Sequence, residues 1–344
     1  MSQAALDLSK RPLLCELLDE HFEADSLQST VGPEADGVPW ACWSTALYTP
    51  LDDFLSRPGK GFRSRLVAAG YQLAGGNAMP RELPAIVESL HAGSLIIDDI
   101  EDESAYRRGA SALHIGYGTA TALNAGSFLY FWPHELLQRM QLHPTQELAM
   151  RRAIDRTMFA AHHGQALDLA VRIAELPQRD AYPVVRATTL LKTGALGRLA
   201  MELGAIAADG SAEVVRAAAQ FGQNLGLGLQ MADDWGGIVS EARCHKGHED
   251  LIFSRPTWPW AWLSRSLDAH SYARLLRLSR QVSQRDAHPE ALAEELRAQL
   301  EADAPQTIHT TLSEALSNLR QVTGKHHVIE HLKAQLETLE ASYV

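Results

Sequence analysis

Apolar residues recur at helical spacing along most of the chain, and the alternating patterns typical of strands are rare. Turn residues at Arg57-Pro58-Gly59 and Gly75-Gly76 separate the first periodic segments. The pattern predicts helices over residues 12–24, 40–55, 62–73, 81–102, 119–141, 144–174, 183–208 and 211–240, with a loose segment over 25–38. Beyond Pro256 it predicts four further amphipathic helices, including 289–301 and 326–339.

This periodicity predicts an all-α fold in which long helices stack as a bundle. We expect an N-terminal helix and loose segment over residues 1–38, followed by one all-α domain over residues 39–344. Hydrophobic residues make up 46% of the 344, which is enough for a sizeable core.

Composition excludes several classes of function. The net charge of −11 argues against general nucleic-acid binding, which needs a basic face. Cys15, Cys42 and Cys244 have neither metal-site spacing nor a disulfide framework, so a reducing compartment is expected. Residues 1–23 resemble neither a signal nor a transit peptide, and no apolar run reaches the ~18 residues of a transmembrane helix. We therefore expect a cytoplasmic protein.

The first candidate for chemistry is an acidic cluster that follows an apolar helical run. The stretch 98–103 carries five carboxylates in six residues. Asp98 and Asp102 are one helical turn apart and face the same way, so a cation between them would relieve their repulsion. Mg²⁺ commonly takes one or two carboxylates together with water or phosphate oxygens, and the nearby Arg107-Arg108 suits phosphate. The cluster predicts a magnesium-bound diphosphate site; the alternative is a solvated acidic helix end.

A second apolar segment, Leu225–Asp234, also ends in paired aspartates. If the two helices face each other, divalent ions could bridge carboxylates from both sides of a cavity. Basic residues that suit phosphate flank both acidic segments, namely Lys60, Arg63, Lys192 and Lys246. The alternative for each lysine is a surface residue whose stem covers apolar neighbours.

In this order, the motifs resemble those of trans-type polyprenyl diphosphate synthases, the group of farnesyl and geranylgeranyl diphosphate synthases. Gly59-Lys60-Gly61-Phe62-Arg63 is similar to the family's first basic segment, and Glu88 to Asp102 to its first aspartate-rich motif. Arg107-Arg108-Gly109 follows at the family distance. Further matches are Gly164–Asp168, Lys192-Thr193-Gly194 and Gln230–Asp234, so that the resemblance covers residues 51–259.

The resemblance implies an isoprenoid-synthase bundle with a central active-site cavity, and a role for each matching residue. The metal ligands for Mg²⁺ would be Asp98, Asp99, Asp102, Asp233 and Asp234. Contacts to the diphosphate of the allylic prenyl substrate would come from Arg107, Lys192 and Lys246, and contacts to isopentenyl diphosphate from Lys60, Arg63, His91 and Arg108. Thr193 and Gln230 would face the developing carbocation.

The chain departs from the family pattern at two positions. Gly237 stands at the fifth position of the second aspartate motif, where the family usually has Asp, and Arg255 stands where Lys is usual. The resemblance also bears on product length, because bulky residues one turn before the first motif stop chain growth in this family. Here the residues are Leu90, Gly93 and Ser94, which predicts a product longer than fifteen carbons, most simply geranylgeranyl diphosphate with twenty.

The predicted function is a Mg²⁺-dependent prenyltransferase that couples an allylic prenyl diphosphate to isopentenyl diphosphate, and the resemblance implies a homodimer. A terpene cyclase on the same fold is the alternative, although it would have no second diphosphate to bind. A non-catalytic partner subunit is a further alternative. A di-iron carboxylate bundle, suggested by Glu88-x-x-His91, would need a second such motif, and none stands at a matching place.

Overall fold

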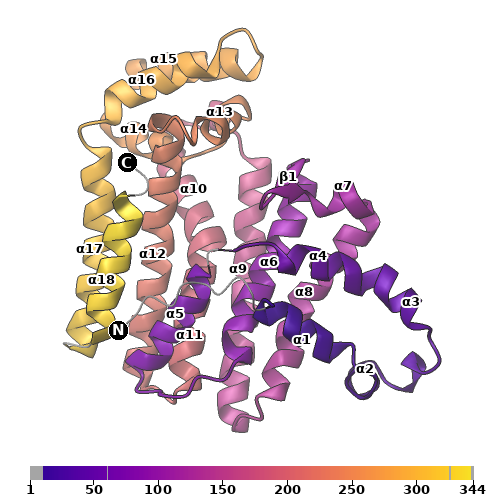
Figure 1. Ribbon diagram of the computed structural model, residues 1–344. Helices are drawn as coiled ribbons and strands as arrows, with labels where there is room; N and C mark the ends of the chain where they lie inside the picture. Colours follow the sequence, from indigo (N-terminus) through magenta and orange to yellow (C-terminus); the bar gives the residue numbers. More distant parts are fainter. Residues whose placement is uncertain (1–10, 60, 325–326, 342–344) are drawn as a thin grey trace. The chain divides into compact units, whose positions relative to one another are not determined.

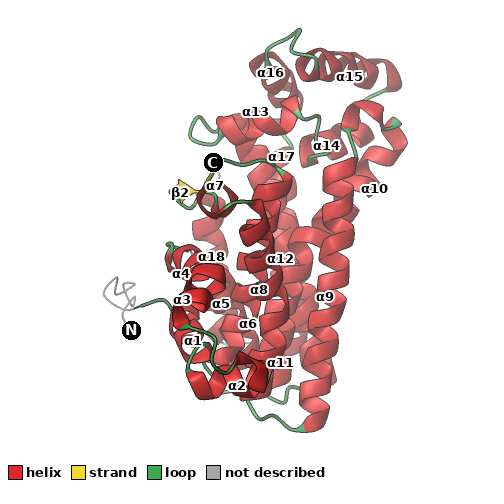
Figure 2. Cartoon of the chain, turned by 90° about the vertical axis from the view of Figure 1, so that its right-hand side faces the viewer, coloured by secondary structure: helices red, strands yellow, loops and turns green. Residues whose placement is uncertain are grey.

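The computed structural model describes residues 11–59, 61–324 and 327–341. Within these ranges nearly every element is a helix, and the strands are confined to one short hairpin (Figures 1 and 2). None of the helices within these ranges combines the length and apolar character that crossing a membrane requires. The predicted all-α fold is confirmed.

Contacts between elements divide the chain into two compact units. Unit 1 comprises Met1–Arg65 and Ala78–Leu148, and unit 2 comprises Leu66–Asn77 and Ala149–Val344. The divisions fall inside α5 (Phe62–Leu73), between α5 and the next helix, and inside the first turns of α9 (Pro144–Ala170). Unit 1 carries the first acidic motif and unit 2 carries the second. The boundary predicted near residue 38 stays a prediction.

Unit 1 begins with a series of short helices and continues with two long ones. The N-terminal elements are α1 (Leu13–His21), α2 (Ala24–Val31), a 3₁₀ turn (Pro33–Ala35), α3 (Trp40–Trp43), a π-helical turn (Ser44–Tyr48) and α4 (Thr49–Ser56). They are followed by α6 (Glu82–Glu101), β1 (Tyr106–Arg107), β2 (Ala110–Ser111), α7 (Leu113–Tyr117) and α8 (Thr119–Arg139).

Helix α6 packs closely along α8, and this contact fixes the helix that carries the first acidic motif. A Cβ atom at Gly93 would lie 2.8 Å from the carbonyl oxygen of Gly126, and one at Gly126 would lie 2.8 Å from Cδ1 of Ile97. The buried Ser89 hydroxyl donates a hydrogen bond to the Leu129 carbonyl at 2.9 Å. The two glycines let the helices approach at a distance that larger side chains would prevent.

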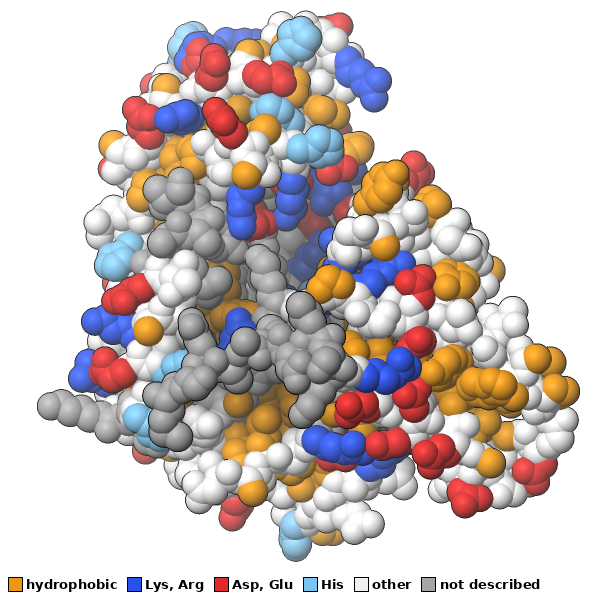
Figure 3. All heavy atoms as spheres, in the orientation of Figure 1, with side chains coloured by type: hydrophobic (Ala, Val, Ile, Leu, Met, Phe, Trp, Pro, Cys, Tyr) orange, Lys and Arg blue, Asp and Glu red, His pale blue; other side chains and the backbone are white. Residues whose placement is uncertain are grey.

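The N-terminal helices of unit 1 combine a hydrogen bond to α8 with an exposed apolar surface. Nδ1 of His21 lies 3.1 Å from Oε2 of Glu135 and joins α1 to α8. Burial alone would raise the pKa of Glu135, but its interactions with His21 and Arg139 hold that pKa below its usual value. Val31 and Trp40, on α2 and α3, are 55% and 52% exposed, and Figure 3 shows apolar side chains over these helices.

Unit 2 is built around the long helix α12. After α9 and a 3₁₀ turn (Ile173–Glu175), its elements are α10 (Gln178–Thr189), a π-helical turn (Leu190–Gly194), α11 (Ala195–Ala207), α12 (Ala212–Val239), α13 (Cys244–Ile252), α14 (Trp258–Ser266), α15 (Ala269–Ser283), α16 (Pro289–Leu300), α17 (Ala304–Thr323) and α18 (His327–Ala341). Ser211 caps the start of α12, because its hydroxyl accepts the Val214 N–H at 3.3 Å.

Glycine also brings the backbones of α11 and α12 together. A Cβ atom at Gly222 would lie 2.1 Å from the carbonyl oxygen of Gly197, so neither position has room for a side chain. The α12 residues Phe221, Leu225 and Met231 are buried in the core of unit 2. Because α12 is packed along its length, the backbone positions of the aspartates near its C-terminal end are fixed.

The observed elements differ from the predicted ones where helices are short. Helix α2 lies in the segment expected to be loose, and α13 and the hairpin were not predicted. Five helices, α14 to α18, follow Pro256 in the described chain instead of four. These segments contain few apolar residues at helical spacing. Helix α13, for example, buries only Gly247 and Leu251. Periodicity is weak evidence over so few turns.

Candidate active site

The first acidic motif lies at the C-terminal end of α6, where the helix dipole disfavours negative charge. The helix ends at Glu101, and the Asp102 N–H still bonds the Asp98 carbonyl at 2.8 Å, so these two aspartates are one turn apart as predicted. The side chain of Asp98 is 22% exposed, whereas that of Asp99 is buried. A cation is therefore the favoured neighbour of this helix end.

The buried Asp99 holds Arg107. Its Oδ1 accepts a hydrogen bond from Arg107 Nε at 2.7 Å and also contacts Nη2, while Nη2 lies 3.8 Å from Asp98 Oδ2. Burial raises the pKa of Asp99, and Arg107 partly opposes that rise. Oδ2 of Asp99 has no hydrogen-bond partner within the described ranges. Arg107, predicted to contact a diphosphate, is thus fixed by a carboxylate predicted to support a metal.

A two-residue hairpin presents the neighbouring arginine. Tyr106 pairs with Ser111 and Arg107 with Ala110, leaving Arg108 and Gly109 as the turn with φ values of 54° and 79°. Two positive φ values match the turn type that two-residue hairpins favour. Arg57 Nη1 donates to the Arg107 carbonyl at 3.2 Å, and the Arg108 guanidinium lies 5.5 Å from the centre of the Phe54 ring.

Three of the four residues predicted to bind isopentenyl diphosphate form one basic group, consisting of Arg63, His91 and Arg108. Burial lowers the pKa of Arg63, and the charge of Arg108 lowers it further, against the opposing effect of Glu88. The pKa of Arg108 is also below its usual value, mainly through burial. Burial and the nearby arginines hold the pKa of His91 well below its usual value, so the imidazole is neutral near pH 7. Lys60 lies outside the described residues.

Two residues near these groups were not singled out from the sequence for this role. Oε1 of Glu88 accepts hydrogen bonds from the Ser64 N–H at 3.0 Å and the Ser64 hydroxyl at 2.8 Å, which fixes a carboxylate that opposes the basic group. His114, on α7, lies near enough to Asp99 to lower its pKa, and its own buried Nδ1 has no hydrogen-bond partner among residues 11–59, 61–324 and 327–341. Helical spacing relates Glu88 to His91, but no local pattern relates His114 to Asp99.

The residues predicted to set product length lie on the preceding turns of α6. Leu90 is 1% exposed, and Ser94 is half-buried with its hydroxyl donating to the His91 carbonyl at 2.9 Å. Gly93 faces α8, and the close approach to Gly126 accounts for a glycine at this position by packing alone. The roles of all three in product length stay predictions.

In unit 2, two basic side chains from α13 and the turn before it hold Asp233. Arg243 Nη1 donates to Oδ1 at 2.9 Å, and Lys246 Nζ donates to Oδ2 at 2.6 Å. Lys246 was predicted to contact the allylic diphosphate, whereas Arg243 was not singled out. Because Arg243 and Lys246 are three residues apart, helical spacing would have placed them on one face.

Asp234 accepts hydrogen bonds from neutral groups, and one of these continues to Thr193. Its Oδ1 accepts from Gln230 Nε2 at 2.7 Å and its Oδ2 from the Trp258 N–H at 2.9 Å. Oε1 of Gln230 accepts in turn from the Thr193 hydroxyl at 2.9 Å. Burial raises the pKa of Asp234 to about 7, although these hydrogen bonds oppose the rise. The residues predicted to face a carbocation, Thr193 and Gln230, are therefore joined directly to the second motif.

A further set of charges surrounds the second motif. Lys192 Nζ donates to Asp168 Oδ2 at 2.6 Å, and Arg255 lies 3.7 Å from both Asp168 and Asp250. Burial raises the pKa of Asp250 to about 6, with Lys246 and Arg255 opposing the rise. A Cβ atom at Gly164 would lie 2.6 Å from the backbone nitrogen of Lys192, so α9 approaches the π-helical turn closely. Asp250 was not predicted, although it follows Lys246 by one helical turn.

The carboxylates of unit 1 fit Mg²⁺ as a partly protein-bound ion. Within the described residues, no three His, Cys, Asp or Glu side chains converge as a ready-made metal site. Mg²⁺ commonly uses one or two carboxylates and completes its octahedron with water and phosphate oxygens. Asp98 and Asp102 on one helix face are a donor set of this kind. Beside them lies the buried Oδ2 of Asp99, which lacks a hydrogen-bond partner in the described part of the chain.

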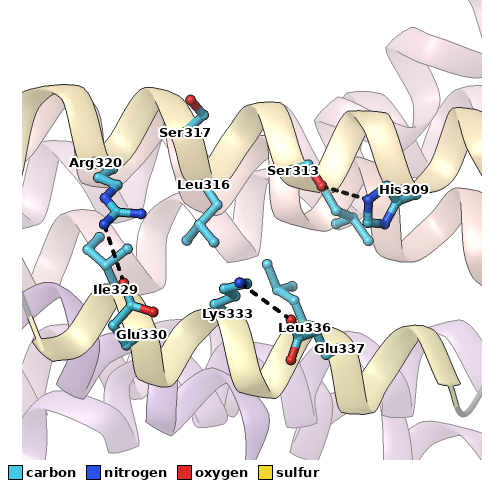
Figure 4. A pocket seen from close by; sticks show the side chains of 11 residues that line it. His309, Ser313, Leu316, Ser317, Arg320, Ile329, Glu330, Lys333, Leu336 and Glu337 are labelled. Carbon is cyan, nitrogen blue, oxygen red and sulfur yellow. Dashed lines mark hydrogen bonds and ion pairs between the residues drawn. The ribbon is translucent and has the colours of Figure 1, made fainter. Parts of the chain in front are cut away.

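A cavity of about 250 Å³ lies elsewhere in unit 2, between α17 and α18. Figure 4 shows Leu316 pointing into it from α17 and Lys333 from α18. The polar groups at its edge interact with one another: Arg320 lies 3.6 Å from Glu330, and Lys333 lies 3.8 Å from Glu337. None of the predicted site residues lines this cavity, so it does not belong to the candidate site.

Comparisons with known proteins place these motifs in a family. Residues 44–296 match the model of the polyprenyl synthetase family. The chain is 30% identical over 269 residues to a geranylgeranyl pyrophosphate synthase from Eremothecium gossypii, covering 74% of this chain and 82% of that protein. A geranylgeranyl pyrophosphate synthase from Aspergillus fumigatus is 30% identical over 220 residues, 62% of this chain and 57% of that protein.

The fold is also that of solved structures. A decaprenyl diphosphate synthase from Rhodobacter capsulatus superposes with a TM-score of 0.73 over 96% of this chain and 95% of that one, at 18% identity. Such a distant likeness supports the fold alone, and the family match supports the class of enzyme. The chain belongs to the polyprenyl synthetase family and is a prenyltransferase of the prenyl diphosphate synthase type.

Proposed function

We propose that this prenyltransferase couples an allylic prenyl diphosphate to isopentenyl diphosphate with the help of Mg²⁺. The basic group of Arg63, His91 and Arg108 carries this proposal. Burial lowers the pKa of both guanidinium groups, neighbouring arginines lower it further, and Glu88 opposes these effects only in part. Positive charges gathered at half-buried positions favour an anionic ligand. A terpene cyclase has no second diphosphate to bind, so this group favours coupling over cyclisation.

The remaining residues divide into those that bind the leaving diphosphate and those that face the hydrocarbon. In this proposal Asp98 and Asp102, supported by Asp99, hold Mg²⁺ on unit 1, and Asp233 and Asp234 are the ligands on unit 2. When bound, Mg²⁺ neutralises the diphosphate that leaves the allylic carbon. Contacts to that diphosphate are assigned to Arg107, Lys192 and Lys246.

The chain's own groups then stabilise charge as it develops. Arg107 is held by Asp99 and Lys192 by Asp168, so both cations are oriented before substrate arrives. The Thr193 hydroxyl and the Gln230 amide offer fixed dipoles to the carbocation, because each is anchored through Asp234. Isopentenyl diphosphate is bound through Lys60, Arg63, His91 and Arg108, which brings its double bond into range as the second reactant.

The test is a product assay with the purified chain, Mg²⁺, labelled isopentenyl diphosphate and allylic primers of five, ten and fifteen carbons. We expect label in a prenyl diphosphate product. Arg63→Gln should raise the KM for isopentenyl diphosphate by on the order of tenfold or more while leaving the KM for the primer nearly unchanged. Consumption of a primer without incorporation of label would instead identify a cyclase.

We propose geranylgeranyl diphosphate, with twenty carbons, as the main product. The names of the curated relatives and the small side chains at Gly93 and Ser94 support this assignment. The fold does not decide length, because a decaprenyl diphosphate synthase shares it. Ser94→Phe should shorten the main product by at least one five-carbon unit, measured by chromatography of the dephosphorylated alcohols. An unchanged distribution would contradict this role for Ser94.

A homodimer and a cytoplasmic location complete the proposal. Exposed apolar side chains on α8 support the dimer, since Leu123 is 49% and Phe131 73% exposed. Phe131→Glu should shift the protein toward the monomer in light scattering coupled to size-exclusion chromatography, whereas exposed Gln138→Glu on the same helix should not. The three free cysteines, Cys15, Cys42 and Cys244, support a reducing compartment.

A further inference from the structure

The aspartate pair of unit 2 is already supplied with hydrogen-bond donors by the protein. Arg243 and Lys246 donate to the two oxygens of Asp233 at 2.9 and 2.6 Å. The Gln230 amide and the Trp258 N–H donate to the two oxygens of Asp234 at 2.7 and 2.9 Å. The two residues differ in the kind of donor, because Asp233 has cationic partners and Asp234 has neutral ones.

Two glycines place the cations beside Asp233. A Cβ atom at Gly247 on α13 would lie 2.0 Å from the carbonyl oxygen of Gly237 on α12. A Cβ atom at Gly237 would lie 3.0 Å from the Cα atom of Gly247. The backbone of α13 therefore lies directly against the position at which the family's third aspartate usually stands. The close approach of α13 leaves little room for a side chain at position 237, which accounts for the missing carboxylate there.

Of the two cations, we expect Arg243 to stay paired with Asp233 more persistently than Lys246 does. Its side chain is 27% exposed, whereas that of Lys246 is 65% exposed. A guanidinium stays charged at any working pH and is less hydrated than an ammonium, so it remains paired where a lysine exchanges with water. A divalent ion that binds Asp233 must displace this guanidinium or share the carboxylate with it.

We propose that Arg243 is a positioning residue that acts as a built-in counter-ion of Asp233 and competes with divalent cations for it. The arginine holds the carboxylate in place, and it raises the divalent-ion concentration needed to occupy the second motif. The proposal rests on the proposed function, in which Asp233 is a metal ligand. It extends that function by assigning to this chain a lower affinity for divalent ions at the second motif than the aspartates alone would give.

The test is a titration of the metal-free full-length protein with Mn²⁺, in which electron paramagnetic resonance measures the free ion. Arg243→Gln should tighten the weakest class of Mn²⁺ sites roughly tenfold, the factor that corresponds to ~1.4 kcal/mol. Arg243→Lys keeps the charge but pairs less persistently, so its Mn²⁺ affinity should lie between those of the wild type and Arg243→Gln. Arg277→Gln, which removes an exposed arginine on α15, is the matched control and should change nothing.

A double variant localises the effect. In Arg243→Gln combined with Asp233→Asn the gain in Mn²⁺ affinity should disappear, because the carboxylate that the arginine protects is gone. Thermal melting of each variant checks that the fold is kept. Equal or weaker Mn²⁺ binding by Arg243→Gln, or no binding by either protein, would overturn the proposal. Failure of the proposed function is a separate result, since it would leave wild-type protein without label incorporation at any Mg²⁺ concentration.

Discussion

The two acidic motifs begin from the same sequence pattern but have different electrostatic surroundings. In unit 1 an arginine from the hairpin, Arg107, bonds the buried Asp99 and approaches Asp98. In unit 2 two cations hold Asp233, and neutral donors hold Asp234. The cations come from the segment that follows each helix, because the hairpin after α6 supplies Arg107, whereas the turn after α12 and α13 supply Arg243 and Lys246. The cations beside an aspartate pair therefore depend on a segment outside its own helix.

The largest expected effect concerns the first motif. Asp98→Asn and Asp102→Asn should each lower kcat by on the order of 10³-fold, because each removes a carboxylate proposed to hold the ion that neutralises the leaving group. Steady-state kinetics at saturating Mg²⁺ measure this. Glu103→Gln, at an exposed position just past the helix, is the control and should stay close to the wild type. A loss of less than about tenfold in both aspartate variants would remove the first motif from the metal site.

The next effect concerns the glycine contact that supplies the second motif with its cations. Gly247→Ala should lower the free energy of unfolding by about 1–3 kcal/mol, since the added methyl group would meet the Gly237 carbonyl and force α13 away. Thermal melting and denaturant titration measure the loss. Gly116→Ala on α7 is the matched control, because nothing lies within 4 Å of a Cβ atom there. Equal losses in the two variants would show that the close contact has no special cost.

The smallest expected effect is a pH dependence specific to the second motif. Burial raises the pKa of Asp234 to about 7, so between its unfolded value of 3.8 and pH 7 the folded protein binds more protons than the unfolded chain. Its contribution to stability is therefore greatest at low pH and is lost as pH rises toward 7. At pH 8 the free energy of unfolding of Asp234→Asn should exceed that of the metal-free wild type by at least about 1 kcal/mol. At pH 5 this advantage should be smaller.

The asparagine variant keeps its hydrogen bonds if the neighbouring amide turns over. Its oxygen can still accept from the Trp258 N–H, and its NH₂ group can donate to a flipped Gln230, which then donates to the Thr193 hydroxyl. Melting curves of both proteins in EDTA from pH 5 to 8 measure the difference. Parallel curves would mean that Asp234 titrates at its ordinary pKa.

The sequence predicted the long helices and the residues at their ends, because both depend on local patterns. Helix α5 was predicted with its observed bounds, and α6 and α12 to within two residues. The spacing of Asp98 and Asp102 followed from helical geometry alone. The grouping of Arg63, His91 and Arg108 was implied by the resemblance and is present in unit 1.

Contacts between distant segments could not be predicted in this way. Nothing local relates His114 to Asp99, or the Trp258 N–H to Asp234, because these pairs are set by how one element packs on another. The same holds for Gly237, which the sequence shows only as a departure from the family pattern. Its physical reason, the approach of Gly247, requires the position of α13. Arg243 and Asp250 could have been found, since both lie at helical spacing from Lys246.

In the hairpin turn of unit 1, Arg108 has opposite expected effects on the stability of the protein and on its activity. Arg108 has a φ of 54°, a left-handed conformation that costs a non-glycine residue on the order of 1 kcal/mol. A glycine there would relax the backbone and yield a sturdier protein, but it would also remove a guanidinium from the group proposed to recruit isopentenyl diphosphate. Selection for heat tolerance alone would therefore be expected to discard this arginine, whereas selection for turnover would retain it.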